Sequence, residues 1–305
     1  MVRTPSLTMS TAIFTAVNTA LLRPLPFPEP DRLVSIFRTT PFFQSGPFSA
    51  PNYLDLERES TTIGTLSAVT FGAGLLMADE RSMRASVVRA SDDYFTMLGV
   101  RPVLGRLFRP EADGAAETPV VALSEEMWRE QFGGDPGVIG TTVRLDGEIH
   151  EVVGILPRDF RVPHGGQQLV GDVWVPLRIQ PWQATARRSN YLMLQGRLAR
   201  GATVEAADQE LRRLMDGLIE QFPQLDGEHL RVVPMHRESK RAIEGPLKLL
   251  LGAVAFVLLI AVANVASLLL ARGAGRQGEW AVRTAIGASR GRILQGALLE
   301  SALLT

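Results

Sequence analysis

Three short patterns in the sequence have residue types that could do chemistry, and each belongs to a different class of site. The string at 273–278 satisfies G-x-G-x-x-G, which binds dinucleotides when it lies between a strand and a helix. The string at 287–291 satisfies G-x-S-x-G, which exposes a nucleophilic serine in hydrolases. His150 and Glu151 begin like the helix of a zinc protease, in which a second histidine completes the metal site.

The residues around each pattern argue against that chemistry. The first pattern follows a long apolar segment instead of a strand, and no histidine follows Ser289 to complete a catalytic triad. Gly154 stands where the zinc pattern needs its second histidine, and no glycine-rich loop precedes either Lys240 or Lys248, so there is no P-loop. We therefore expect no catalytic residue, no metal and no cofactor, and a protein that is not itself an enzyme.

The composition sets wide limits on function. A chain of 305 residues has room for one large or two ordinary domains. Its 32 basic and 32 acidic residues balance, so the whole-chain charge does not favour a nucleic-acid partner. The chain has no cysteine, which excludes disulfides, thiolate zinc sites and cysteine nucleophiles, but does not identify a compartment.

The longest feature is an uncharged, proline-free segment at 249–271. At about 1.5 Å per helical residue it is long enough to cross a hydrocarbon core of about 30 Å. We interpret it as a transmembrane helix and give the helix the range 246–271; a fully buried core helix is the alternative. Residues 1–23 are also poor in charge and end before a proline-rich stretch, which indicates part of a first membrane helix rather than a signal peptide.

Residues 24–245 have the composition of a water-soluble domain of mixed α+β class. Three polar residues, Ser49, Ser124 and Thr203, precede helical patterns and could cap them. Asp146 and Gly147 form the turn of a predicted hairpin at 142–153. Further predicted elements are strands at 33–38, 86–90, 120–123, 172–177, 191–198 and 230–235, and helices at 92–98, 125–132 and from 203 to 222.

The segment at 272–292 is arginine-rich and amphipathic, which is typical of a segment at a membrane face or against a partner. Residues 293–305 turn apolar again and indicate the start of a further membrane helix that is cut short. Because a large domain is translocated largely regardless of its charge, the arginine-rich segment places the cytoplasm on its own side. The large domain would then lie outside, between two membrane helices.

Four residues of the predicted membrane helix have types suited to helix packing. Ala263, Ser267 and Ala271 form a ridge of small side chains, and Asn264 is a polar group that would seek a partner at membrane depth. The small residues also fit a chance distribution in an alanine-rich helix.

Five strings in this order resemble one known family. Residues 18–34 (NTALLRPLPFPEPDRLV), 90–106 (ASDDYFTMLGVRPVLGR) and 152–160 (VVGILPRDF) resemble the MacB-like periplasmic core domain of ABC transporter permeases. Residues 264–272 (NVASLLLAR) and 279–293 (EWAVRTAIGASRGRI) are similar to the start of the FtsX-like permease domain. The resemblance covers nearly the whole chain, although the first membrane helix is short and later helices are missing, as in a fragment.

The resemblance implies a non-catalytic subunit of the bacterial inner (plasma) membrane with a periplasmic domain. A separate or fused ABC ATPase would drive it, and Glu279, Arg283 and Arg290 would contact that ATPase. It implies a homodimer or paired permease in membrane lipid, with a periplasmic adaptor as a further partner. The expected function is export or extraction of a lipophilic or peptide-like substrate; the alternative is an FtsX-like protein that regulates a periplasmic partner such as a cell-wall hydrolase.

Overall fold

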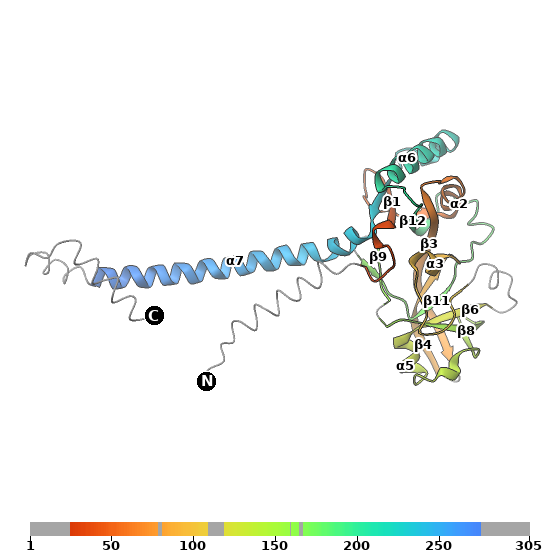
Figure 1. Ribbon diagram of the computed structural model, residues 1–305, viewed down its shortest axis with the longest axis horizontal. Coiled ribbons are helices and arrows are strands. Elements are labelled where there is room, and N and C mark those ends of the chain that lie inside the picture. Colours follow the sequence, from red (N-terminus) through yellow and green to blue (C-terminus); the bar gives the residue numbers. More distant parts are fainter. Residues whose placement is uncertain (1–24, 79–80, 109–118, 159, 165–166, 276–305) are drawn as a thin grey trace, which may run out of the picture. The chain divides into compact units, whose positions relative to one another are not determined.

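The structure is a computed structural model that describes residues 25–78, 81–108, 119–158, 160–164 and 167–275 (Figure 1). These residues fall into two compact units, divided between Ile243 and Glu244. The first unit carries the strands and shorter helices, and the second carries most of the helix α7. The predicted segments at 1–23 and 293–305, and most of the segment at 272–292, lie outside the described residues.

The described elements are a mixture of strands and helices, with runs of consecutive strands such as the one at 142–198. The strands are β1 (Leu33–Thr39), β2 (Phe48–Ser49), β3 (Ile63–Ala78), β4 (Arg81–Ala90), β5 (Leu104–Gly105), β6 (Val120–Ser124), β7 (Thr142–Leu145), β8 (Glu148–Leu156), β9 (Val162–His164), β10 (Gln167–Leu169), β11 (Val173–Pro176), β12 (Asn190–Leu198) and β13 (His229–Pro234). The helices are η1 (Pro30–Arg32), α2 (Ala50–Glu59), α3 (Tyr94–Leu98), α5 (Glu125–Gln131), η2 (Pro136–Val138), α6 (Val204–Gln221), η3 (Pro223–Leu225) and α7 (Met235–Gly275). The predicted α+β class is confirmed.

The predicted helix caps are correct, because each capping side chain accepts a hydrogen bond from the first turn of its helix. Ser49 accepts from the Asn52 amide, Ser124 from Met127 and Thr203 from Ala206. The predicted hairpin turn is also correct: Asp146 and Gly147 have φ values of 52° and 90°, as a type I′ turn requires. His150 lies in the hairpin strand β8, with its Nδ1 3.0 Å from the Glu148 carbonyl.

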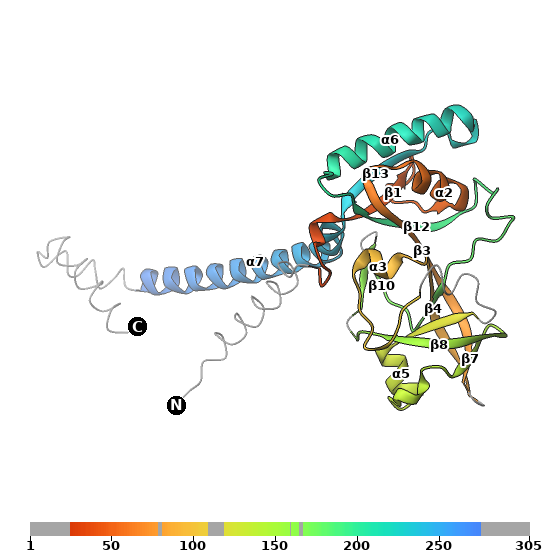
Figure 2. The same cartoon turned by 45° about the vertical axis from the view of Figure 1, so that its right-hand side comes forward.

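One half of the first unit is a sheet covered by helices, here called the helical lobe. Strands β13, β1, β12 and the first part of β3 lie in that order, and Figure 2 shows α2 and α6 beside them. The amphipathic face of α6 buries Leu211, Met215 and Leu218 against this sheet. Burial of such a side chain stabilises the fold by about 1.5–3 kcal/mol.

The other half of the first unit is a closed ring of six strands, here called the barrel lobe. β3 pairs with β4, and the ring then continues through β11, β6, β8 and β7 back to β3. Apolar side chains from all six strands fill the ring, and Met127 and Trp128 of α5 pack onto them. Closure removes free strand edges. The 16-residue strand β3 runs through both lobes and joins them.

A carboxylate fastens α6 to the turn between α2 and β3. Glu210 Oε1 accepts from the Thr61 amide at 3.0 Å, its Oε2 accepts from the Thr62 amide at 2.9 Å, and both threonine hydroxyls also donate to it. Partial burial raises the pKa of Glu210, but these hydrogen bonds outweigh burial and bring it down to about 2.

We expect Glu210→Gln to lower the free energy of unfolding by about 1–3 kcal/mol at neutral pH, because an amide cannot accept all of these hydrogen bonds. The folded pKa lies below the usual value of 4.5. The stabilisation is therefore complete above pH 4.5 and falls as the pH drops towards 2. Urea unfolding of the full chain in detergent at pH 7 and pH 3 measures it. An equal effect of the substitution at both pH values would contradict the prediction.

Candidate functional site at the connector junction

The segment that leads into β1 and the segment that follows β13 lie side by side. Residues 25–32, here called the connector, lead into β1, and α7 follows β13 directly. β1 and β13 are antiparallel, with Val34 opposite Pro234, so the start of β1 lies beside the end of β13. The segments that lead towards the two predicted membrane helices therefore enter and leave the domain side by side.

Both ends are anchored in the same apolar core. Phe27 of the connector, Leu33 at the start of β1 and Met235 at the start of α7 are buried in one cluster. Leu33 and Met235 are both 0% exposed. Trp174 and Phe95 belong to this cluster as well. Because protein cores are close-packed, a displacement of the connector would also shift the side chains that pack around the start of α7.

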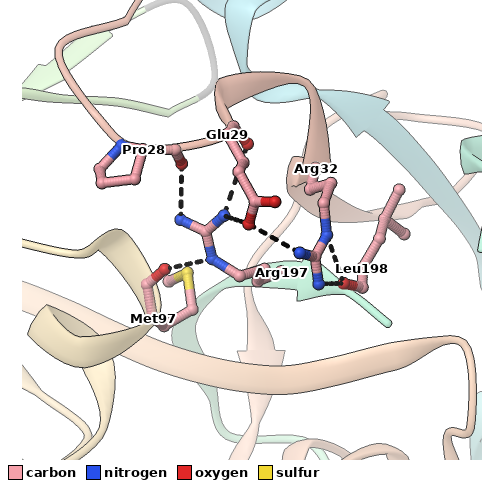
Figure 3. Close-up of polar contacts among 6 residues, drawn as sticks. All are labelled: Pro28, Glu29, Arg32, Met97, Arg197 and Leu198. Carbon is pink, nitrogen blue, oxygen red and sulfur yellow. Dashed lines mark hydrogen bonds and ion pairs between the residues drawn. The ribbon is translucent and has the colours of Figure 1, made fainter. Parts of the chain in front are cut away.

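Two arginine side chains tie the connector to the rest of the first unit (Figure 3). Arg197 of β12 donates from Nη2 to the Pro28 carbonyl at 3.0 Å and from Nε to the Met97 carbonyl of α3 at 2.7 Å. Arg32 donates twice to the Leu198 carbonyl, at 3.2 and 2.7 Å. The connector is thus tied to the central strand β12 and, through Arg197, to α3.

Glu29 joins the two arginines. Its carboxylate lies 2.7 Å from Arg32 Nη1 and 3.6 Å from Arg197 Nη1. Burial, followed by the neighbouring charge of Arg32, lowers the pKa of Arg197, and Glu29 opposes this effect. The carboxylate therefore allows two guanidinium groups to lie together.

The backbone of Glu29 is strained. Its φ of 46° and ψ of 57° lie in the left-handed region, which costs a residue with a side chain about 1 kcal/mol or more. The surrounding contacts hold this conformation, since the Glu29 carbonyl also accepts from the Arg32 amide at 3.0 Å. Strain of this kind concentrates at functional sites.

Gly99 lies against the connector at a position where a side chain would collide with it. Gly99, which ends α3 with a φ of 72°, lies against the ring of Pro28. A Cβ on Gly99 would come within 2.8 Å of Pro28 Cγ and 2.9 Å of its Cδ. Gly99, Pro28, Glu29, Arg32 and Arg197 are hereafter called the junction.

The site residues predicted from sequence lie elsewhere. Ala263, Asn264, Ser267 and Ala271 belong to α7, and the first three are exposed. Ala263 and Ser267 are four residues apart and so share one helix face. Glu279, Arg283 and Arg290 lie outside the described residues. Sequence reasoning missed Glu29 and Arg197; the one local signal was the proline alternation that ends beside Glu29.

α7 is long and apolar enough to cross a membrane. Its window Leu251–Leu268 has a mean hydropathy of 2.4, and no part of that window is buried. A core helix of a soluble domain would bury most of such a surface. This window is therefore one candidate membrane span among the described residues. Within the described ranges, no group of three potential metal ligands is close enough to hold an ion.

Comparison with known proteins gives one family. Residues 6–214 match the family described as MacB-like periplasmic core domain. Macrolide export ATP-binding/permease proteins MacB of Neisseria gonorrhoeae and Neisseria meningitidis are 24% identical over 245 residues, which is 79% of this chain and 36% of each relative. The chain thus spans about a third of the length of these relatives.

Two solved structures share the fold. The periplasmic region of MacB from Actinobacillus actinomycetemcomitans is 15% identical, with a TM-score of 0.52 over 74% of this chain and 98% of that one. A domain of a permease protein from Porphyromonas gingivalis is 16% identical, with a TM-score of 0.52 over 68% of this chain and 92% of that one.

Proposed function

Because the chain belongs to the family of MacB-like periplasmic core domains, we propose that it is the permease part of an ABC-type transporter that couples a cytoplasmic ATPase to movement of its periplasmic domain. The transporter would export or extract a lipophilic or peptide-like substrate on the periplasmic side. The names of the curated relatives, which are macrolide export proteins, support export over the regulation of a periplasmic partner.

The junction is the observation that carries this proposal. A permease without catalytic residues must turn motion of its membrane helices into motion of its outer domain. The connector and α7 join the domain side by side, in one core, and Arg197 ties the connector to β12 and α3. Motion delivered through either end would therefore reach the paired strands β13, β1 and β12 together.

The remaining parts of the path are assigned from the family resemblance. The ATPase would bind on the cytoplasmic side through polar contacts with Glu279, Arg283 and Arg290. Its conformational change would then move α7, which crosses the bilayer. Ala263, Ser267 and Ala271 would let a neighbouring helix approach closely, with Asn264 hydrogen-bonded to it. That neighbour would belong to a second permease copy, and a periplasmic adaptor would complete the export path.

We expect charge reversal at Glu279 or Arg283 in the complete permease to lower substrate-stimulated ATPase activity about tenfold. The physical reason is that a reversed charge meets a like charge across a partner interface, which costs about 1–2 kcal/mol or more. Purified permease and ATPase in lipid vesicles, assayed with and without substrate, measure this. Unchanged stimulation in both variants would contradict the coupling role.

Membrane insertion needs a control, because a misinserted permease would also lose stimulation. The chain has no cysteine, so single cysteines can be introduced at Gly147 and Gly278. An impermeant thiol reagent should label intact cells at Gly147→Cys but not at Gly278→Cys, in the parent and in both charge variants. Labelling at Gly278→Cys alone would refute the periplasmic orientation.

A further inference from the structure

The outer surface of the barrel lobe carries an exposed apolar row. Phe71, Leu75 and Met77 alternate along β3 and are 53%, 49% and 37% exposed, and Ile149 of β8 is 47% exposed. Single exposed apolar residues are common, but three large ones along one strand, with a fourth two strands away across β7, form a patch of the kind found at binding surfaces.

The strand registers place these side chains on one face. Met77 lies opposite Arg144 of β7, and Arg144 lies opposite Ile149 of β8. Directly opposed residues point to the same side of a sheet. The intervening residue Leu76 points the other way, into the filled interior of the ring. The row is therefore an outer face of β3, β7 and β8, which Figure 2 shows in the lower part of the domain.

Two arginines flank the row. Arg84 of β4 lies opposite Leu75 and is exposed, and Arg144 is exposed although it donates to the Gly147 carbonyl at 3.0 Å. Two carboxylates lie on the same face nearer the helical lobe. Asp172 accepts from the amide and hydroxyl of Ser86, and Glu151 is half-buried. Among the described residues, the arginines are the charged groups that directly oppose the row: Arg84 lies opposite Leu75, and Arg144 lies opposite both Met77 and Ile149.

The row is remote from the junction. Ile63, at the start of β3, pairs with Leu198, whose carbonyl Arg32 binds. Phe71 and Met77 follow Ile63 by 8 and 14 residues on the same strand, a path of about 26 and 46 Å along the strand at 3.3 Å per residue. A surface this far from the points where the chain turns towards its predicted membrane helices favours a protein over lipid.

We propose that this barrel face, made of Phe71, Leu75, Met77, Ile149, Arg84 and Arg144, binds a segment of a partner protein that presents apolar side chains next to carboxylates. The apolar row supplies the contact that excludes water, and the arginines orient the segment through ion pairs at the rim. This inference does not depend on the coupling role of the junction.

The test is photo-crosslinking in the cells that make the complete protein. A benzophenone amino acid at Leu75 should give a crosslink to a partner protein, and peptide mass spectrometry should place it within a few residues of Asp or Glu. Arg84→Glu should lower the yield of that product by about fivefold or more, because reversal replaces an attraction by a repulsion.

Arg81→Glu is the matched control, because Arg81 lies on the same strand and is also exposed, but points to the other face of β4. It should leave the yield unchanged. A crosslink to lipid, to a second copy of this chain or within the chain would overturn the proposal. So would a yield that Arg84→Glu leaves unchanged, or the absence of any crosslink.

Discussion

Replacing Trp174 by alanine should lower the free energy of unfolding by about 3–5 kcal/mol. Trp174 is 1% exposed and belongs to an apolar cluster that draws side chains from strands of both lobes. Its ring lies 5.9 Å from Tyr94, 5.5 Å from Phe95 and 5.1 Å from Phe160. Its indole N–H donates to the Gly171 carbonyl at 3.1 Å, so the alanine variant also leaves that acceptor without this donor. Urea unfolding followed by circular dichroism measures the loss.

Trp182→Ala provides the control for this measurement. Trp182 is 63% exposed, so its removal should change the free energy of unfolding by no more than about 0.5 kcal/mol. Trp174→Phe should fall between the two, since it keeps an aromatic ring and leaves a smaller cavity. Equal midpoints for the two alanine variants would show that the aromatic cluster does not hold the lobes together.

The cluster matters for the connector as well as for stability. Phe27 packs edge-on against Phe160 at 6.3 Å, and Phe160 contacts Trp174. Removal of Trp174 should therefore loosen the connector even when the domain stays folded. The core that stabilises the domain is also the core that holds its two ends.

Local chemistry made much of the fold predictable. Ser124 followed by a helical pattern predicts its own cap, and Asp146 with Gly147 predicts a turn, because each signal acts within a few residues. The strand β3 was not predicted, because no such local signal marks it. Its burial does not follow one alternation, since Leu66 to Val69 are covered on both faces while Phe71, Leu75 and Met77 are exposed.

The junction could not be predicted from one sequence for a different reason. Arg197 and Glu29 are 168 residues apart, and nothing in the chain between them indicates that they meet. Arg197 alternates with apolar residues on β12, which is the ordinary pattern of a half-buried strand. Only the pairing of β1 with β12, in which Leu33 lies opposite Arg197, brings the arginine beneath the connector.

Arg197→Met should speed hydrogen exchange of the backbone amides at 29–33 by about 30-fold or more. Methionine keeps the apolar stem but leaves the Pro28 and Met97 carbonyls without their donor and Glu29 with one arginine. We expect this to cost the docked connector about 2–4 kcal/mol. Exchange at 142–156 in the barrel lobe should not change, which separates local release from global unfolding.

Arg129→Met is the matched control for the loss of an arginine. The guanidinium of Arg129 pairs with Glu125 at 2.7 Å, but its side chain is 58% exposed, so the pair contributes about 0–1 kcal/mol. Exchange at 29–33 should match the parent protein in this variant. An equally small effect of Arg197→Met would mean that other contacts, such as those of Phe27 and Arg32, hold the connector without Arg197.

Gly99→Ala loosens the same contact without removing a charge, and so tests whether the junction acts as one unit. The added Cβ must displace Pro28, and it also strains a backbone with φ of 72°. Gly201→Ala has a similar φ of 81° with no atom within 4 Å, so it carries the strain without the collision. Faster exchange at 29–33 in Gly99→Ala but not in Gly201→Ala would assign the effect to the connector.

Substrate-stimulated ATPase activity of the complete permease then tests the coupling role of the connector. If Arg197→Met and Gly99→Ala both lower this activity, release of the connector uncouples the outer domain. If exchange rises in both variants and the stimulation is kept, motion is transmitted through α7 and β13 instead.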